Sequence, residues 1–175
     1  MLKTLQKIYR VGLVTEPAPA ADESLSLRKV LQGRILAVMG RALCVRAVDA
    51  GSCNGCELEM QALGNPIYNI EGCGIRFVAS PRHADLLLVT GPVTVNMRDA
   101  LLRVYEATPD PKLVVAVGDC GCSGGIFGVS NACLGPVSAV LPVDAAVPGC
   151  PPDPTRLLRG ILAAVSAARP LAAGG

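Results

Sequence analysis

The apolar positions beyond residue 42 form short, nearly continuous runs separated by amphipathic stretches. Such runs occupy 43–48, 75–79, 85–90, 112–118 and 144–147. Runs of this length indicate strands that are buried on both faces, as in a parallel sheet. Intervening stretches with helical spacing predict that helices cover both faces of the sheet. The expected fold is therefore α/β, with a flavodoxin-like parallel sheet whose chemistry lies beyond the carboxyl ends of its strands.

The N-terminal segment differs in pattern from the rest of the chain. Residues 1–14 predict a short basic amphipathic helix, and residues 15–24 are a Pro-, Ala- and acid-rich linker. A helix is expected from Ser24 or Ser26 to about Gly40. The helix over 1–14 is interpreted as a docking arm for a partner subunit or as a frayed tail. The predicted domains are an arm and linker at 1–24, a single α/β domain at 25–170 and a tail at 171–175.

Composition narrows the function classes. Hydrophobic residues make up 51% of the 175 residues, which is enough for a core and excludes wholesale disorder. A net charge of +2 and 3% aromatic residues disfavour nucleic-acid binding. Charged residues amount to only 17%, below the roughly 25% of average soluble chains. We therefore expect a subunit whose surface is largely covered in a complex.

No segment has the pattern of a membrane span. The longest uncharged run, 120–143, is interrupted by glycines and prolines, which is typical of loops. The apolar stretch near the N-terminus is too short for a signal peptide. We therefore expect a cytoplasmic chain without a transmembrane helix.

The eight cysteines are the strongest chemical signal. Disulfides are disfavoured in a reducing cytosol, so clustered thiols indicate metal or redox chemistry. Five cysteines follow three predicted strands, whose carboxyl ends meet at one edge of the sheet; they are Cys53, Cys56, Cys120, Cys122 and Cys150. The remaining three are interpreted as small buried side chains; they are Cys44, Cys73 and Cys133.

The pair Cys53 and Cys56 alone is compatible with zinc, a redox dithiol or an iron–sulfur cluster. Structural zinc sites usually combine two close pairs. A site that adds Cys120 or Cys122 and then Cys150 has a 2+1+1 distribution, which favours a [4Fe–4S] cluster. Glycines crowd these cysteines and allow close backbone approach to a cluster; they are Gly51, Gly55, Gly118, Gly121, Gly124, Gly125 and Gly149.

Four segments then carry a family resemblance. They are 49–59 (DAGSCNGCELE), 80–92 (SPRHADLLLVTGP), 118–127 (GDCGCSGGIF) and 143–152 (VDAAVPGCPP). Together they resemble the 20 kDa subunit family, the cluster-bearing small subunits of respiratory complex I and of [NiFe] hydrogenases. The C-x-x-C spacing at Cys53 and Cys56 is similar to group 4 membrane-bound hydrogenases and formate hydrogenlyases, whereas complex I members typically carry adjacent cysteines.

The resemblance implies one proximal [4Fe–4S] cluster held by Cys53, Cys56, Cys120 and Cys150, with Cys122 as the reserve ligand. It implies an electron relay between a large [NiFe]-type catalytic subunit and a ferredoxin-like polyferredoxin subunit. Membrane-arm subunits are further expected partners, and nucleic acid is not. The expected location is peripheral, on the cytoplasmic side of the inner membrane.

Several residues are candidates for tuning this site. Glu57 or Glu59 is expected to affect proton coupling, or else to be an exposed acid at a helix start. Arg82 is expected to neutralise cluster charge or to pair with Asp85. His83, the only histidine, is interpreted as a titrating group near the cluster or quinone, or as a structural residue. The other expected neighbours are Asp119, Gly55, Gly121, Gly124 and Gly125.

Two other function classes remain open on the sequence. One is a small chain of the complex I kind that passes electrons to quinone. The other is a zinc-stabilised assembly protein without redox function.

Overall fold

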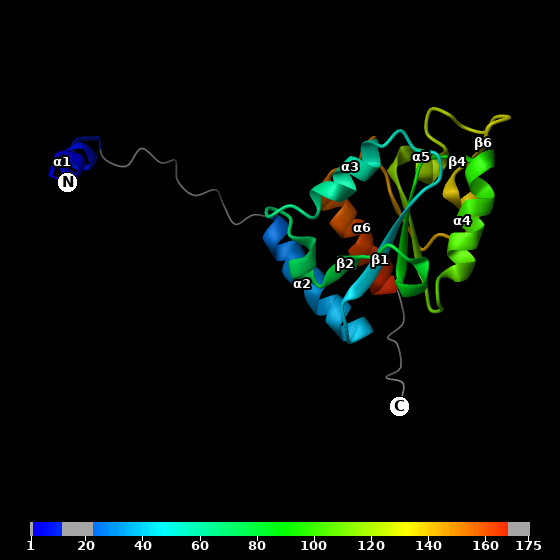
Figure 1. Ribbon diagram of the computed structural model, residues 1–175, viewed down its shortest axis with the longest axis horizontal. Helices are drawn as coiled ribbons and strands as arrows, with labels where there is room; N and C mark the ends of the chain where they lie inside the picture. The colour runs from blue at the N-terminus through cyan, green and yellow to red at the C-terminus, as the bar shows by residue number, and fades with distance from the viewer. Residues whose placement is uncertain (1, 12–22, 168–175) are drawn as a thin grey trace.

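A computed structural model describes residues 2–11 and 23–167. Five parallel strands form the main sheet (Figure 1). In spatial order they are β2 (Ile75–Phe77), β1 (Leu43–Asp49), β3 (Leu86–Thr90), β5 (Leu113–Val117) and β7 (Ala145–Val147). Counted along the chain, this order is 2-1-3-4-5, the flavodoxin-like order, and the predicted fold class is confirmed.

The helices lie on both faces of this sheet. They are α2 (Glu23–Met39), α3 (Gly55–Ala62), α4 (Val95–Ala107), α5 (Gly118–Ser123) and α6 (Pro154–Ala167). The N-terminal segment forms the predicted helix α1 (Leu2–Val11). Most of the predicted linker, and the whole predicted tail, lie outside the described residues; α2 already begins at Glu23, inside the stretch predicted as linker.

Side chains alternate across the sheet into two cores. Leu86 and Leu88 of β3 pack with α2, α3 and α6 on one face. Leu87 and Val89 face the other core, which includes Leu101 of α4. Successive side chains of a strand point to opposite faces, so a strand with a helix layer on each side must be apolar throughout. All five residues of β3 are accordingly buried.

Several short elements fill the connections. They are the 3-10 helices η1 (Ile70–Cys73), η2 (Pro81–His83) and η3 (Val137–Ala139), and the antiparallel pair β4 (Val93–Thr94) and β6 (Cys133–Gly135). Two of the three cysteines interpreted as packing residues, Cys73 and Cys133, are buried as expected, whereas Cys44 is only half-buried. No helix among the described residues combines the length and the apolar character that crossing a bilayer requires.

Candidate metal centre

Four cysteines line one cavity at the carboxyl ends of β1, β3, β5 and β7. The cavity measures about 190 Å³ and includes the thiols of Cys53, Cys56, Cys120 and Cys150. It lies beside the point between β1 and β3 where the winding of the sheet reverses direction, the usual ligand position in such folds. The structure therefore brings together the four residues that the resemblance implies as ligands.

Cys53 and Cys56 are positioned by the turn after β1. The Asp49 carboxylate accepts hydrogen bonds from the backbone N–H groups of Gly51 and Ser52, both at 2.7 Å. Cys56 follows in the first turn of α3. A polar turn at the strand end thus delivers one thiol from the loop and one from the helix.

Asp119 joins the segments that carry the other two thiols. Its carboxylate accepts from the Gly149 N–H at 2.7 Å, and its own N–H donates to the Gly149 carbonyl at 2.8 Å. This two-way contact fixes the loop before Cys150 against the start of α5, which holds Cys120. Asp119 also lines the cavity, as expected for a neighbour of the site.

Cys122 lies elsewhere. Its thiol is 3.6 Å from the Ala116 carbonyl, to which it donates, and it packs against the core on the α4 face. Two residues along a helix correspond to a rotation of about 200°. For this reason Cys120 lines the cavity and Cys122 does not.

The glycines around the cavity differ in what they contact. A Cβ on Gly118, where φ is +81°, would stand 2.6 Å from the Cys56 sulfur, and one on Gly125 would stand 2.8 Å from the Cys120 sulfur. Gly55 lines the cavity directly. Gly121 and Gly124 instead pack against backbone, with Val89 and Gly128 as their nearest neighbours, so they support the loop without lining the cavity.

Burial and neighbouring acidic groups raise the pKa of two of the four thiols. Burial, then Glu57 and the other three cysteines, raises the pKa of Cys56 to about 12. Burial, then Cys150, Cys53 and Asp119, raises the pKa of Cys120. Without bound metal, Cys56 and Cys120 therefore stay protonated at neutral pH, and a positively charged metal is needed to hold these two as thiolates.

The arrangement of donors suits a cluster better than a single ion. Across the described residues, no three His, Cys, Asp or Glu side chains lie close enough to hold one metal ion. Instead, the four thiols surround a cavity, and glycine backbone approaches two of the sulfurs closely. An iron–sulfur cube takes one thiolate at each of four corners, whereas zinc draws four sulfurs to about 2.3 Å from one point.

Glu57 is turned into the protein. Its Oε1 accepts from the hydroxyls of Ser52, at 2.6 Å, and of the buried Thr90. Its Oε2 is buried and has no hydrogen-bond partner among the described residues. Glu57 is therefore not the exposed helix-start acid that was one expectation, and Glu59 on the same helix lies outside this hydrogen-bonded group. The sequence analysis gave no role to Ser52 or Thr90. The position of Thr90, a polar residue that ends an apolar strand at this edge, was a signal that could have indicated it.

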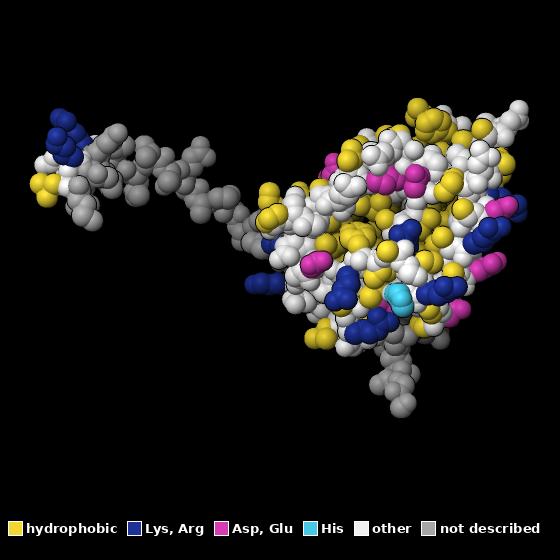
Figure 2. Space-filling view, viewed as in Figure 1, with side chains coloured by type: hydrophobic (Ala, Val, Ile, Leu, Met, Phe, Trp, Pro, Cys, Tyr) yellow, Lys and Arg dark blue, Asp and Glu magenta, His cyan; other side chains and the backbone are white. Residues whose placement is uncertain are grey.

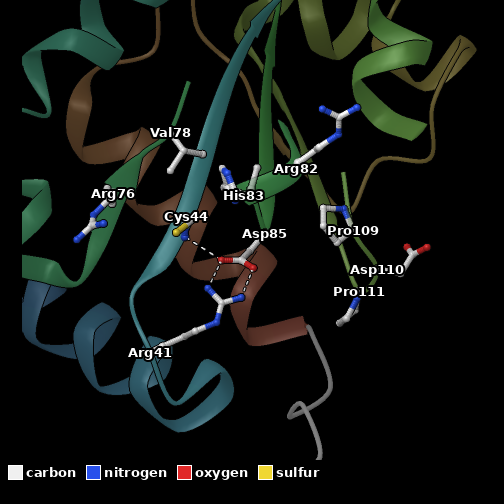
Figure 3. A pocket seen from close by; sticks show the side chains of 11 residues that line it. Arg41, Cys44, Arg76, Val78, Arg82, His83, Asp85, Pro109, Asp110 and Pro111 are labelled. Atoms are coloured by element: carbon white, nitrogen blue, oxygen red, sulfur yellow. Dashed lines mark hydrogen bonds and ion pairs between the residues drawn. The ribbon is translucent and has the colours of Figure 1, made fainter. Parts of the chain in front are cut away.

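Arg82 and His83 do not reach the cysteine cavity. They lie in η2, before β3, and β3 spans roughly 17 Å of extended chain between them and the carboxyl edge. Both line a different cavity at the amino-terminal edge of the sheet (Figure 3). The expectation that they lie near the cluster is wrong because they precede the strand that the cysteine loops follow.

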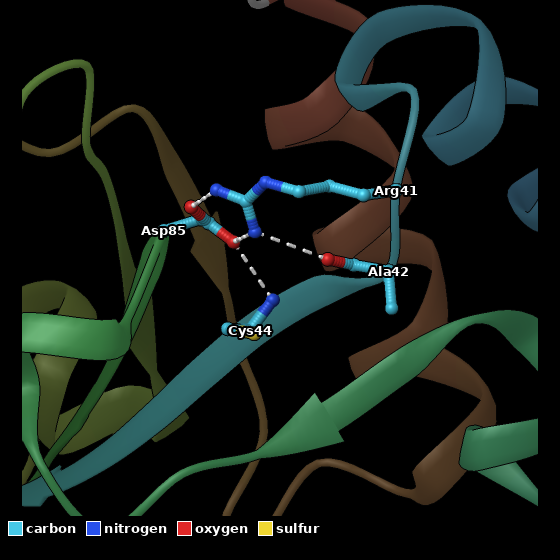
Figure 4. A network of polar contacts seen from close by, with 4 residues as sticks. All are labelled: Arg41, Ala42, Cys44 and Asp85. Atoms are coloured by element: carbon cyan, nitrogen blue, oxygen red, sulfur yellow. Dashed lines mark hydrogen bonds and ion pairs between the residues drawn. The ribbon is translucent and has the colours of Figure 1, made fainter.

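Asp85 pairs with Arg41 and not with Arg82. Arg41 Nη2 and Nη1 lie 2.6 and 2.9 Å from the two carboxylate oxygens, and the Cys44 N–H donates to the same carboxylate at 2.9 Å (Figure 4). Arg41 and Asp85 are 44 positions apart in the chain. The sequence therefore suggested Arg82, which is close to Asp85 in the chain, as the partner.

Comparisons with known proteins agree with this geometry. Residues 53–164 match the family described as NADH ubiquinone oxidoreductase, 20 kDa subunit. The probable membrane-bound hydrogenase subunit mbhJ of Pyrococcus furiosus is 46% identical over 143 residues, covering 80% of this chain and 86% of that one. Formate hydrogenlyase subunit 7 of Escherichia coli is 43% identical over 150 residues, 85% of this chain and 58% of the relative.

More distant relatives extend the group. A subunit of the NADH-quinone oxidoreductase of Citrifermentans bemidjiense is 46% identical over 107 residues, covering 61% of this chain and 62% of that one. A chain in the solved structure of a membrane-bound sulfane sulfur reductase, an archaeal respiratory membrane complex, superposes with a TM-score of 0.63. It shares 31% identity, and the match covers 83% of this chain and 75% of that one. The chain therefore belongs to the NADH ubiquinone oxidoreductase 20 kDa subunit family, whose members here are subunits of oxidoreductase complexes.

Proposed function

We propose that this chain is the electron-transfer small subunit of a membrane-bound [NiFe] hydrogenase complex of the formate hydrogenlyase kind. The observation that carries the proposal is the single cavity lined by thiols from three separate strand ends. Cys53, Cys56, Cys120 and Cys150 would hold one proximal [4Fe–4S] cluster. When bound, the cluster supplies one-electron transfer at a potential tuned by its surroundings.

The residues around the cavity prepare it for such a cluster. Gly118 and Gly125 leave room at two sulfurs, and the paired contacts between Asp119 and Gly149 hold two ligand loops in register. Glu57 holds the Ser52 loop against Thr90 at the end of β3. Its free, buried Oε2 makes Glu57, and not Glu59, the candidate for proton coupling.

A partner subunit would cover the cysteine edge. Cys53 and Cys150 are exposed in the isolated chain, as are three apolar side chains of the loop after α5: Ile126, Phe127 and Val129. Exposed apolar patches of this kind mark interaction surfaces. The large catalytic subunit would lie there, a ferredoxin-like polyferredoxin subunit would exchange electrons with the cluster, and membrane-arm subunits would hold the assembly peripherally at the cytoplasmic side of the inner membrane.

The hydrogenase assignment is supported over its main alternative by two observations. The C-x-x-C spacing of Cys53 and Cys56 is similar to that of group 4 membrane-bound hydrogenases. The Pyrococcus furiosus hydrogenase relative also matches more of this chain than the quinone oxidoreductase relative does. A chain of the complex I kind that delivers electrons to quinone is the second candidate, because the quinone oxidoreductase relative reaches the same identity over its shorter match. A zinc-stabilised assembly protein is the weaker alternative, because the thiols surround a cavity.

Purification of the tagged full chain with its native membrane complex tests the assignment. We expect a co-purified large subunit, about one nickel per complex and hydrogen evolution with a reduced dye. A complex that contains iron and sulfide but no nickel, and that reduces quinone, would contradict the hydrogenase assignment and favour the second candidate.

A further inference from the structure

A second cavity lies at the amino-terminal edge of the sheet, at the end opposite the cysteines. It measures about 600 Å³ and lies between the starts of β1 and β3 and the turn at 109–111. Pockets of 300–1,000 Å³ typically bind small ligands. The proposed electron transfer gives this cavity no role.

The wall of this cavity carries three arginines against two carboxylates, those of Asp85 and Asp110. Arg41, Arg76, Arg82 and His83 contribute to it, and Figure 3 shows Arg76 and Arg82 on opposite sides with His83 between them. On the surface, Lys and Arg side chains gather around the single histidine (Figure 2). Cations are thus concentrated at one edge of a molecule that is poor in charge.

Two of these positive charges are not balanced. Asp85 takes the charge of Arg41 at 2.6 Å, and Asp110 lies 3.6 Å from Lys112. Arg76 and Arg82 are exposed and make no hydrogen bond or ion pair with any described residue. Neither therefore has a contact to give up when an anion enters, and together they offer two positive charges.

We propose that this cavity binds a phosphate group. The planar donor fork of arginine matches phosphate oxygens, and two unbalanced guanidinium groups match a doubly charged anion better than a single carboxylate. The Asp85 carboxylate fixes the Arg41 guanidinium in the lining of the cavity and balances its charge, so the charge available to the anion comes from Arg76 and Arg82.

The phosphate belongs either to a soluble anion or to a phospholipid headgroup. The lipid source rests on the proposed membrane-bound complex, whereas the soluble source does not. Both sources are tested on the full, cluster-loaded chain. Calorimetric titration with inorganic pyrophosphate tests the soluble source, and co-sedimentation with phosphatidylglycerol vesicles, with phosphatidylcholine vesicles for comparison, tests the lipid.

The variants Arg76→Gln and Arg82→Gln are compared with Arg34→Gln, a matched change at an exposed arginine of α2 that does not line the cavity. We expect each cavity variant to weaken binding about fivefold and the double variant about 25-fold, with Arg34→Gln within about twofold of wild type. Bound ligand should also slow alkylation of the half-buried Cys44 thiol, which lines the cavity.

Binding in either arm with this pattern supports the proposal, and the responding arm names the source. Failure of both probes to bind, or an equal loss in Arg34→Gln, would overturn it. Release of the Arg76→Gln and Arg82→Gln chains from the native complex, with pyrophosphate and vesicle binding unchanged, would overturn it too and would assign this cavity to contact with an acidic protein instead. Unchanged visible absorbance in all variants separates these outcomes from any failure of the cluster assignment.

Discussion

Cys120 and Cys122 show how strongly one helical turn separates two thiols. Cys120 lines the cavity, whereas Cys122 donates to the Ala116 carbonyl and packs in the core. We expect Cys120→Ser to reduce bound iron from about four atoms per chain to nearly none. Cys122→Ser should keep both the iron and the visible absorbance. Chemical analysis of iron and sulfide in the two purified variants tests this ligand assignment. Loss of iron only in Cys122→Ser would refute it.

Gly118 provides a second test at residue scale. Its φ of +81° and the 2.6 Å from an added Cβ to the Cys56 sulfur predict that Gly118→Ala displaces that thiol. Left-handed backbone costs a non-glycine residue about 1–2 kcal/mol, and cluster occupancy should fall together with thermal stability.

The matched change is Gly33→Ala in the middle of α2. No atom lies within 4 Å of the added Cβ, and φ there is ordinary. Alanine in a helix is more stable than glycine by about 0.5–1 kcal/mol. Thermal unfolding should therefore shift upward while iron content is unchanged; equal iron loss in both variants would contradict the account of Gly118.

At the scale of elements, the Arg41–Asp85 contact ties the end of the α2 segment to the starts of β1 and β3. Asp85 is 9% exposed and accepts three hydrogen bonds. Asp85→Ala leaves the Cys44 N–H without its acceptor and should cost about 2–3 kcal/mol. The melting temperature should fall by about 5–10 °C.

Asp99→Ala is the control for this change. Asp99 is exposed on α4 and lies 3.7 Å from Arg98. Surface pairs of this kind contribute at most about 1 kcal/mol. Circular dichroism melts of the two variants should differ clearly, and equal melting temperatures would show that the Asp85 clamp does not stabilise the fold.

Some elements are determined by the local sequence, and others depend on contacts between distant segments. The buried strands and α2, α4 and α6 follow from apolar periodicity, and the sequence predicts them within a few residues. The helix α5 (GDCGCS) has poor helix-forming residues and is held by contacts of Asp119 with Gly149, 30 positions away. The short pair β4 and β6 likewise depends on pairing between distant segments. Local patterns carry no information about such contacts.

At the scale of the whole molecule, strand order decides which chemistry meets. Because all five strands are parallel, every loop that follows a strand opens at one edge, and the cysteines gather there. The same rule sends η2, with Arg82 and His83, to the opposite edge. The gathering of five cysteines at one edge was therefore predictable from strand ends, and the choice of Cys120 over Cys122 came from the family resemblance. The basic cavity also required the contact between Arg41 and Asp85.

The central claim is that the four-thiol cavity holds an iron–sulfur cluster that carries single electrons. Metal and sulfide analysis combined with electron paramagnetic resonance of the dithionite-reduced full chain tests it most directly. The account predicts about four iron and four sulfide per chain, broad visible absorbance and a signal that appears on one-electron reduction. A colourless chain with about one zinc, no sulfide and no signal would contradict it.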